Sequence, residues 1–235
     1  GKILNSLASL RLDNNTIVIF TTDNGPNGNR FNGNMKGRKG SYDEGGVRVP
    51  FFLRYPNGNL AKGQAMTELT AHIDLLPTLS DLCGITLPDS LELDGKNITP
   101  LLKGANQNWE DRSIYSFRHG APFTPHPGAV RTPTHRWVLQ RDSSIALYDM
   151  QKDPAQKQNI AADYPEIVAS IGAAYAQKIQ EVTTNSVLVP PIPVGYKNAS
   201  TVSMPATDAI LAGDIGFKEG HGWANDWLIN WSTTK

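Results

Sequence analysis

The sequence has a single cysteine, no long apolar run and no excess of charge of either sign, and each of these absences excludes a class of protein. Cys83 is the only cysteine, so no disulfide can form within the chain and a small scaffold held together by disulfides is excluded. No apolar run approaches the roughly 20 residues that a membrane-spanning helix needs, so no membrane span is predicted. The 22 basic residues are balanced by 22 acidic ones, so no overall field favours nucleic acid or an anionic membrane as a partner.

The rest of the composition is that of a globular protein with many loops. Of the 235 residues, 39% are hydrophobic and 19% are charged, which is typical of a soluble globular chain. This length is enough to bury a sizeable core in one large domain or two modest ones. Glycine and proline are frequent, with 21 and 16 residues, and both residue types favour turns and loops.

The first quarter of the chain predicts a helix, a buried strand, a long loop and a second strand. Apolar residues at helical spacing over residues 3–10 predict the helix. The continuous apolar run at residues 16–22 predicts a strand covered on both faces, as in a parallel sheet. A second extended stretch follows at residues 47–56, and residues 25–46 between the two are a polar loop. Loops of this length in compact domains are usually functional.

The stretch "HIDLLPTLSDLCGI" carries the signals of a short helix. Asp74 is the predicted N-cap, and Pro77 falls in the first turn, where its missing N–H costs nothing. Gly84 is predicted to end the helix. Cys83 is therefore expected to be a buried helix residue without a chemical role.

Beyond residue 109 the pattern changes to short strands and one long helix. Candidate strands alternate with Pro, Gly and Asp turns and predict an antiparallel meander at residues 112–118, 128–132, 135–140 and 145–149. An amphipathic helix is predicted over residues 164–182, with Asp163 and Glu166 spaced as a capping box. The remaining residues are rich in proline and are expected to form an extended tail.

Asp23 and Asn24 are the first candidates for a chemical role. They place two hard oxygen ligands at the carboxyl end of the first strand, where open α/β sheets bind their ligands. The alternative is a turn that merely begins the loop. Two ligands cannot satisfy a calcium ion, which takes about 6–8 oxygens, so other segments would have to supply the rest.

The loop that follows carries Lys36, Arg38 and Lys39. Lysine and arginine can hold an anionic group, the first as a point charge and the second through two parallel hydrogen bonds. The alternative is a solvated basic loop. The spacing of a phosphate-binding Walker motif is absent.

The order of the motifs "TTDNG", "RKGSYDEGGVRVPFF", "HIDLLPTLSDLCGI", "LDGKNITPLL" and "LYDMQKDPAQKQNIA" closely resembles the C-terminal part of formylglycine-dependent sulfatases. The resemblance runs from about residue 1 to residue 180. It implies an α/β fold in which residues 1–108 are part of an alkaline-phosphatase-like core. Residues 109–185 would form a small α+β subdomain, a four-stranded antiparallel sheet with a helix. Residues 186–235 would be a Pro-rich tail leading to a further segment.

The resemblance also implies roles for particular residues. Asp23 and Asn24 match the family's pair on the divalent cation, which is usually calcium, with magnesium as the alternative. Lys39 matches the lysine that contacts the sulfate group and is the predicted catalytic residue. Lys36 and Arg38 have no firm counterpart and are predicted to shape substrate entry. His119 follows a subdomain strand expected to face the mouth of the active site, and it is predicted as a further substrate contact.

Glu44 and Arg48 match positions expected to be structural. A buried pair or loop anchor is the favoured interpretation for these two residues, rather than a catalytic role.

The predicted function is hydrolysis of sulfate esters, either aryl sulfates or sulfated glycans. No Cys/Ser-x-Pro-Ser/Ala-Arg motif occurs in the chain, so the formylglycine nucleophile is expected in an N-terminal half and the chain alone is expected to be inactive. A phosphodiesterase or phosphonate hydrolase of the same superfamily remains an alternative, as does a non-catalytic binding module. The resemblance further suggests a bacterial protein that is periplasmic or secreted.

Overall fold

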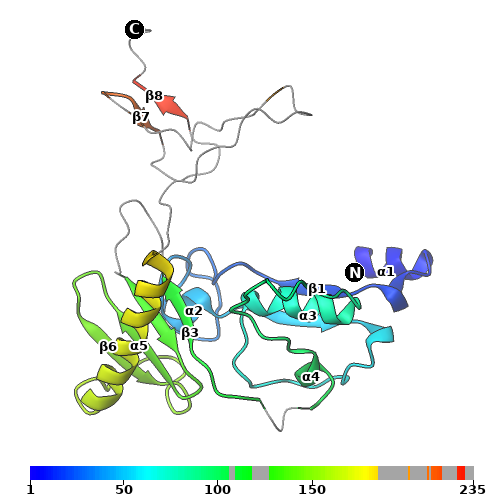
Figure 1. Cartoon of the computed structure of the whole chain (residues 1–235), viewed down its shortest axis with the longest axis horizontal. Coiled ribbons are helices and arrows are strands. Elements are labelled where there is room, and N and C mark those ends of the chain that lie inside the picture. Colours follow the sequence, from blue (N-terminus) through cyan, green and yellow to red (C-terminus); the bar gives the residue numbers. More distant parts are fainter. Residues whose placement is uncertain are drawn as a thin grey trace. The chain divides into compact units, whose positions relative to one another are not determined.

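The computed structural model describes residues 1–105, 109–117 and 127–184, together with residues 201, 211, 213–218 and 227–230 (Figure 1). The chain divides into two compact units. The first comprises residues 1–118 and 125–180, and the second comprises residues 119–124 and 181–235. Within the described residues, no helix has both the length and the apolar character needed to cross a membrane.

The first unit begins with helix α1 (Lys2–Ser9), the 3-10 helix η1 (Asp13–Asn15) and strand β1 (Val18–Thr21). Strand β1 pairs with β2 (Phe51–Arg54) in an antiparallel register that joins Val18 to Arg54 and Thr21 to Phe51. The predicted helix and both predicted strands are therefore confirmed. The long loop between the strands turns the chain back on itself, so the two strands run in opposite directions.

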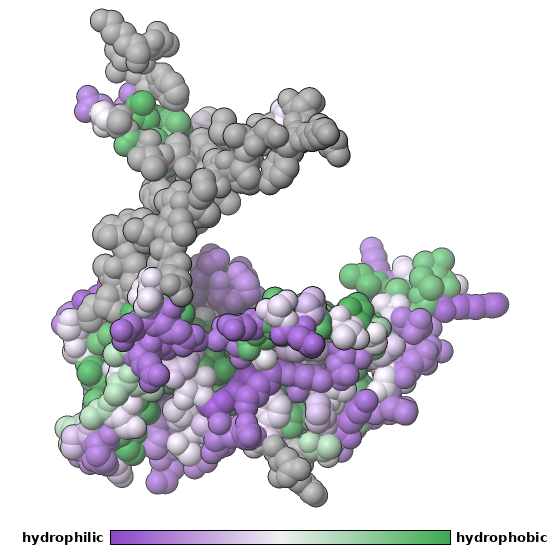
Figure 2. Space-filling view, in the orientation of Figure 1, coloured by the Kyte–Doolittle hydropathy of each residue, from purple (hydrophilic) through white to green (hydrophobic). Residues whose placement is uncertain are grey.

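The expectation that the first strand is covered on both faces is wrong for the described residues. Phe20 is 61% exposed and its cross-strand neighbour Phe52 is 67% exposed. Helix α1 is also exposed on its apolar side, which Figure 2 shows as hydrophobic surface at that end of the unit. An apolar run indicates that a strand requires burial, but it does not identify the segment that covers it.

Helix α3 (Leu75–Leu82) follows the 3-10 helix η3 (His72–Asp74) and ends as predicted at a glycine. Gly84 has a φ of 66°, and Ile85 N–H donates to Ser80 O at 2.8 Å, the hydrogen bond that closes a Schellman motif. Cys83 is the C-cap residue and is exposed. The expectation of a buried cysteine is therefore wrong, because the helix stops one residue before it.

A small apolar cluster joins the core elements. Helix α4 (Thr99–Leu102) contributes Leu101, and Leu53 of β2 and Leu82 of α3 pack against its cluster. The 3-10 helix η2 (Pro56–Gly58) follows β2 in the chain, and helix α2 (Glu44–Val47) lies at the end of the long loop.

The predicted antiparallel meander is confirmed. Strands β3 (Ile114–Phe117), β4 (Gly128–Arg131), β5 (His135–Leu139) and β6 (Ile145–Asp149) pair in the order β3-β4-β5-β6, each antiparallel to the next. The predicted long helix is α5 (Pro165–Thr184), which crosses the sheet in Figure 1.

Alternate residues of the meander face opposite sides, as the pleat of a sheet requires. One face packs on α5, where the rings of Trp137 and Tyr175 lie 5.2 Å apart between centroids. The other face carries Val138 and Tyr148, and Tyr42 of the long loop packs against their cluster. The sheet therefore lies between α5 and the loop that holds the predicted site residues.

In the second unit, strands β7 (Gly216–Phe217) and β8 (Leu228–Ile229) form a short antiparallel ribbon. The assignment of residues 186–235 to an extended tail stays a prediction, since most of that stretch lies outside the described residues.

Candidate functional site

Two backbone hydrogen bonds bring the tip of β1 and the basic loop together. Gly25 N–H donates to Gly46 O at 2.8 Å, and Lys39 N–H donates to Pro26 O at 3.0 Å. Asp23 and Asn24 directly precede the first of these donors. The predicted cation ligands and the predicted sulfate-binding lysine therefore lie on two segments that are joined through their backbones.

Glycine is required where the two segments touch. A Cβ atom on Gly25 would lie 1.9 Å from Gly45 O, and a Cβ atom on Gly45 would lie 2.6 Å from Gly37 O. No side chain fits at such distances without moving the backbone. The "EGG" sequence thus serves close packing of three backbone segments.

The three basic side chains of the loop differ in what they contact. Lys36 Nζ donates to Tyr148 Oη at 2.7 Å and pairs with Asp43 Oδ1 at 3.4 Å. Arg38 Nη1 donates to Asn29 Oδ1 at 3.0 Å. The exposed Lys39 side chain makes no hydrogen bond or ion pair with the residues that the structure describes. Lys39 alone of the three is thus uncommitted within that part of the chain.

The pKa of Lys36 reflects this attachment to the sheet. Burial lowers the pKa, but the hydrogen bond to Tyr148 and the charge of Asp43 outweigh that effect, and the pKa is raised. Lys36 therefore remains a cation that links the loop to β6. Its predicted contact with substrate stays a prediction, and so does that of Arg38.

Asp23 and Asn24 fit one side of a cation site. The Asp23 side chain is exposed and has no hydrogen-bond partner in the described residues, while Asn24 Nδ2 donates to Gly25 O at 2.9 Å and leaves the amide oxygen available. No cluster of three or more His, Cys, Asp or Glu that would hold a metal occurs among these residues. The two oxygens can therefore be only part of a ligand set.

His72 supports the tip of β1 from the side. Its Nε2 lies 2.9 Å from Thr22 O, and because a carbonyl only accepts, Nε2 is the donor. This contact ties η3 to the residue before Asp23. The sequence offered no signal for it beyond the position of His72 ahead of a helix.

Glu44 is the centre of a buried ionic cluster that attaches the loop to the meander. Its side chain is 5% exposed. Arg136 of β5 reaches Oε2 with Nε at 2.8 Å and Nη2 at 2.6 Å. Arg131 Nε lies 3.4 Å from the same oxygen, and Arg48 Nη1 lies 3.6 Å from Oε1. The predicted anchor role of Glu44 is confirmed. A buried pair with Arg48 is not, because the Arg48 side chain is 61% exposed.

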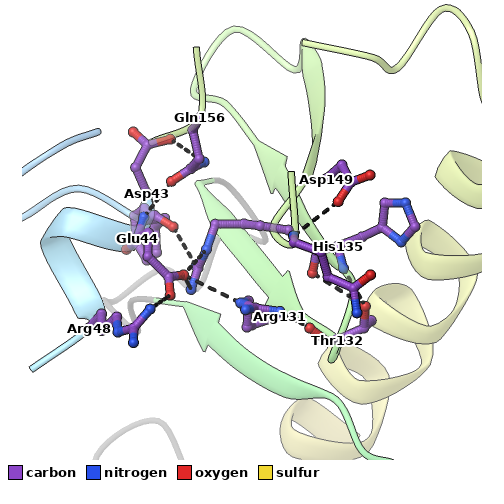
Figure 3. Close-up of polar contacts among 11 residues, drawn as sticks. Asp43, Glu44, Arg48, Arg131, Thr132, His135, Asp149 and Gln156 are labelled. Carbon is purple, nitrogen blue, oxygen red and sulfur yellow. Dashed lines mark hydrogen bonds and ion pairs between the residues drawn. The ribbon is translucent and has the colours of Figure 1, made fainter. Parts of the chain in front are cut away.

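Further hydrogen bonds complete this attachment. Glu44 N–H donates to Gln156 Oε1 at 2.6 Å, and Gln156 Nε2 donates to Asp43 Oδ1 at 3.2 Å. Arg136 Nη1 donates to Tyr42 O at 2.9 Å. Figure 3 shows the side chains of Gln156 and the meander directed at this short stretch of the loop. The meander therefore holds the loop through both side-chain and backbone groups.

The cluster has more positive than negative charge. Burial lowers the pKa of Arg131, the charge of Glu44 opposes this effect, and the charges of Arg136 and Arg48 add to the lowering. Glu44 is the carboxylate that all three guanidinium groups share. Its removal would leave like charges facing one another in a buried place.

Sequence reasoning missed the partners that the meander supplies. Arg131, Arg136, Tyr148 and Gln156 stand in ordinary strand and turn positions, and only the rarity of a buried arginine within a strand sets Arg136 apart. His119, the remaining predicted substrate contact, lies outside the described residues.

Asp74 is the N-cap residue of α3, as predicted, but its side chain has another role. Its carboxylate makes no capping bond to α3. It pairs instead with both Nη atoms of Arg112, and it accepts from Lys96 N–H at 2.8 Å and Ala71 N–H at 2.7 Å. The side chain is fully buried, and a buried carboxylate requires an opposite charge.

Comparison with known proteins gives concordant results. The family model described as "N-sulphoglucosamine sulphohydrolase, C-terminal" matches residues 38–185. Human steryl-sulfatase is 36% identical over 195 residues, which is 67% of this chain and 33% of the relative. An N-acetylgalactosamine-6-O-sulfatase of Bacteroides thetaiotaomicron is 30% identical over 194 residues, 73% of this chain and 38% of the relative. The chain therefore spans less than half of these relatives.

A solved structure of a 2-O GAG sulfatase superposes with a TM-score of 0.61 at 27% identity, over 76% of this chain and 39% of that one. This likeness supports the predicted fold class, a partial alkaline-phosphatase-like core followed by a four-stranded antiparallel sheet and a helix. The family model covers more than half of the chain. The chain belongs to the sulfatase family and corresponds to its C-terminal region.

Proposed function

We propose that the whole protein hydrolyses sulfate esters, with Asp23 and Asn24 helping to hold a divalent cation and Lys39 binding the sulfate group. The observation that carries this proposal is the joining of the two segments by Gly25 N–H to Gly46 O and by Lys39 N–H to Pro26 O. The residues proposed to bind the cation and the sulfate thus stand on two segments that are joined through their backbones, which supports the proposal. Membership of the sulfatase family supports the same assignment.

The proposed role of Lys39 is electrostatic. Negative charge builds up on the transferring sulfate and on the leaving oxygen during hydrolysis, and a fixed positive charge stabilises it most when it is held in place beforehand. The backbone of Lys39 is held by Pro26, and the following segment is held by the Glu44 cluster. A bound calcium or magnesium ion would supply Lewis-acid neutralisation of the sulfate oxygens.

The nucleophile and the remaining cation ligands would come from segments outside these 235 residues. No Cys/Ser-x-Pro-Ser/Ala-Arg sequence is present, and we propose that formylglycine is formed in an earlier part of the whole protein. The isolated chain would then be inactive. The substrates would be aryl sulfates or sulfated glycans, the classes suggested by the names of relatives such as N-acetylgalactosamine-6-O-sulfatase. A bacterial location in the periplasm or outside the cell is part of the same proposal.

A substrate panel tests the function. The whole protein should hydrolyse 4-nitrophenyl sulfate much faster than bis(4-nitrophenyl) phosphate, and addition of EDTA should reduce the rate. The Lys39→Ala variant should lower kcat by about 100-fold or more, the effect of removing one preorganised donor. Arg30→Ala, which removes another exposed cation of the same loop, is the matched control. A preference for the phosphodiester would replace this proposal with a phosphodiesterase.

A further inference from the structure

An open cavity of about 490 Å³ is lined in part by the loop segment that follows Lys39 in the chain. One wall is the loop segment that begins at Gly40, the residue directly after Lys39. The other wall is the end of the meander at β5 and the turn that follows it. The lining residues are Gly40, Ser41, Tyr42, Asp43, Pro127, Val138, Gln140, Arg141 and Asp142. A cavity of this size is within the range that small-molecule ligands occupy.

Both walls are held firmly. Tyr42 packs on the cluster that contains Val138, so the loop is attached to the sheet next to the cavity. In the turn, Gln140 N–H donates to Ser144 O at 2.9 Å, and Asp142 Oδ1 accepts from Ser144 N–H at 3.0 Å and from Ser144 Oγ at 2.7 Å. The cavity is therefore preformed by the fold rather than by one loose loop.

The polar groups around the cavity differ in what already binds them. Asp43 pairs with Lys36 and accepts from Gln156, and Asp142 accepts from Ser144. The side chains of Gln140 and Arg141 make no hydrogen bond or ion pair with the rest of the described chain. Arg141 thus offers a planar guanidinium that suits a carboxylate or a sulfate.

The lining of the cavity offers several polar groups that suit a sugar. Five lining residues, Ser41, Asp43, Gln140, Arg141 and Asp142, carry polar or charged side chains, whereas only Pro127 and Val138 are purely aliphatic. Sugar hydroxyls can donate to Asp142 and accept from Gln140.

We propose that this cavity is the subsite for the alcohol part of the substrate, and that it takes a sugar carrying a second anionic group bound by Arg141. The second anion is a sulfate or a carboxylate, which share the geometry that a guanidinium recognises. This inference rests on the proposed function, because Lys39, the proposed sulfate-binding residue, directly precedes Gly40, which lines the cavity. Arg141 then determines which sugar is bound, without contacting the sulfate ester bond that is hydrolysed.

The test compares substrates with and without the second anion, using the whole protein. The substrates are N-acetylgalactosamine 6-sulfate, its 4,6-disulfate, a uronic acid 2-sulfate and 4-nitrophenyl sulfate. The 4,6-disulfate and the uronic acid 2-sulfate are the two doubly anionic sugars. For the one that the wild-type protein prefers, Arg141→Ala should raise KM about tenfold or more, because a charged hydrogen-bond pair is lost. Its KM for the monosulfated sugar and kcat for 4-nitrophenyl sulfate should change less than about twofold. Arg141→Lys should recover part of the loss, and Lys62→Ala, outside the cavity, should change nothing.

The outcomes separate the two proposals. An equal change of KM for singly and doubly anionic sugars would overturn the subsite but not the function. So would hydrolysis of 4-nitrophenyl sulfate with no activity on any of the sugars. If the wild-type protein hydrolyses no sulfate ester at all, the proposed function fails and the subsite fails with it. If Arg141→Ala raises KM for the uronic acid sulfate but not for the disulfate, the second anion is a carboxylate.

Discussion

Arg136 of β5 donates from Nε and Nη2 to one oxygen of Glu44, at 2.8 and 2.6 Å, although the two residues stand 92 positions apart in the chain. Both side chains are almost fully buried. The pair attaches the loop that carries Lys39 to a sheet formed much later in the sequence. The antiparallel meander is therefore part of what holds the candidate site in shape.

Replacing Glu44 by Gln should destabilise the protein strongly. The variant keeps the shape of the side chain but leaves the guanidinium groups of Arg131 and Arg136 without their counter-charge in a buried place. Loss of one partner from such a cluster costs about 3–5 kcal/mol. Urea unfolding of the whole protein measures the effect, with Glu92→Gln as the exposed control, which should change the free energy of unfolding by less than about 0.5 kcal/mol. Similar values for the two variants would contradict the anchor role.

Replacing Gly25 by Ala should weaken the proposed cation binding, although Gly25 is not one of the proposed ligands. The new Cβ would lie 1.9 Å from Gly45 O, so the tip of β1 must move away from the "EGG" segment. Calcium titration of the whole protein by calorimetry should show affinity reduced by about tenfold or more, the size of effect typical for supports of metal ligands. Gly28→Ala is the control for backbone strain alone. Gly28 has a φ of 81°, which strains an alanine, but no atom lies near its Cβ position, so there is no steric clash. Its affinity should stay near that of the wild type.

Replacing Arg112 by Met should leave the fully buried carboxylate of Asp74 without a positive partner. The expected loss in the free energy of unfolding is about 3–5 kcal/mol. Lys96→Met breaks an ion pair with Glu110, whose side chain is 82% exposed, and should cost at most about 1 kcal/mol. A double variant, Asp74→Asn with Arg112→Met, should lose less than the sum of the single losses. Additive losses would show that the two residues do not act as a pair.

Tyr175 should make stability depend on pH in the alkaline range. Burial raises its pKa from 10.0 to about 12, so the folded protein keeps a proton that the unfolded chain releases in this window. The free energy of unfolding therefore falls as pH rises between these values, by up to about 1.4 kcal/mol per pH unit. Unfolding at about pH 9 and about pH 11 should show a larger fall for the wild type than for Tyr175→Phe, which cannot ionise. Equal falls would contradict the burial of the phenol.

The local features were predictable because they depend on neighbours in the sequence. Periodicity identified α1, β1, β2 and α5, Gly84 marked the end of α3, and turn residues separated the four strands of the meander. Each of these signals acts within a few residues, through backbone conformation or the burial of one face. Their positions therefore follow from the chain without knowledge of its fold.

Long-range partners were not predictable in the same way. Asp74 stands where a helix cap belongs, yet its buried carboxylate is satisfied by Arg112. Lys36 stands in a loop of basic residues, yet it is bound to Tyr148 of β6. In both cases the local preference was real, and a partner from a distant part of the chain decided the contact that formed.

By itself the sequence determined the order of the elements, the family, and the placement of Asp23 and Asn24 before the long loop and of Lys39 within it. Only the tertiary structure decided that β1 and β2 run antiparallel, that Gly25 touches Gly45, and that the meander binds Glu44. The reason is physical. Spacing along the chain governs local conformation, whereas the partner of a buried charge or of a backbone N–H is whichever group the fold brings within reach.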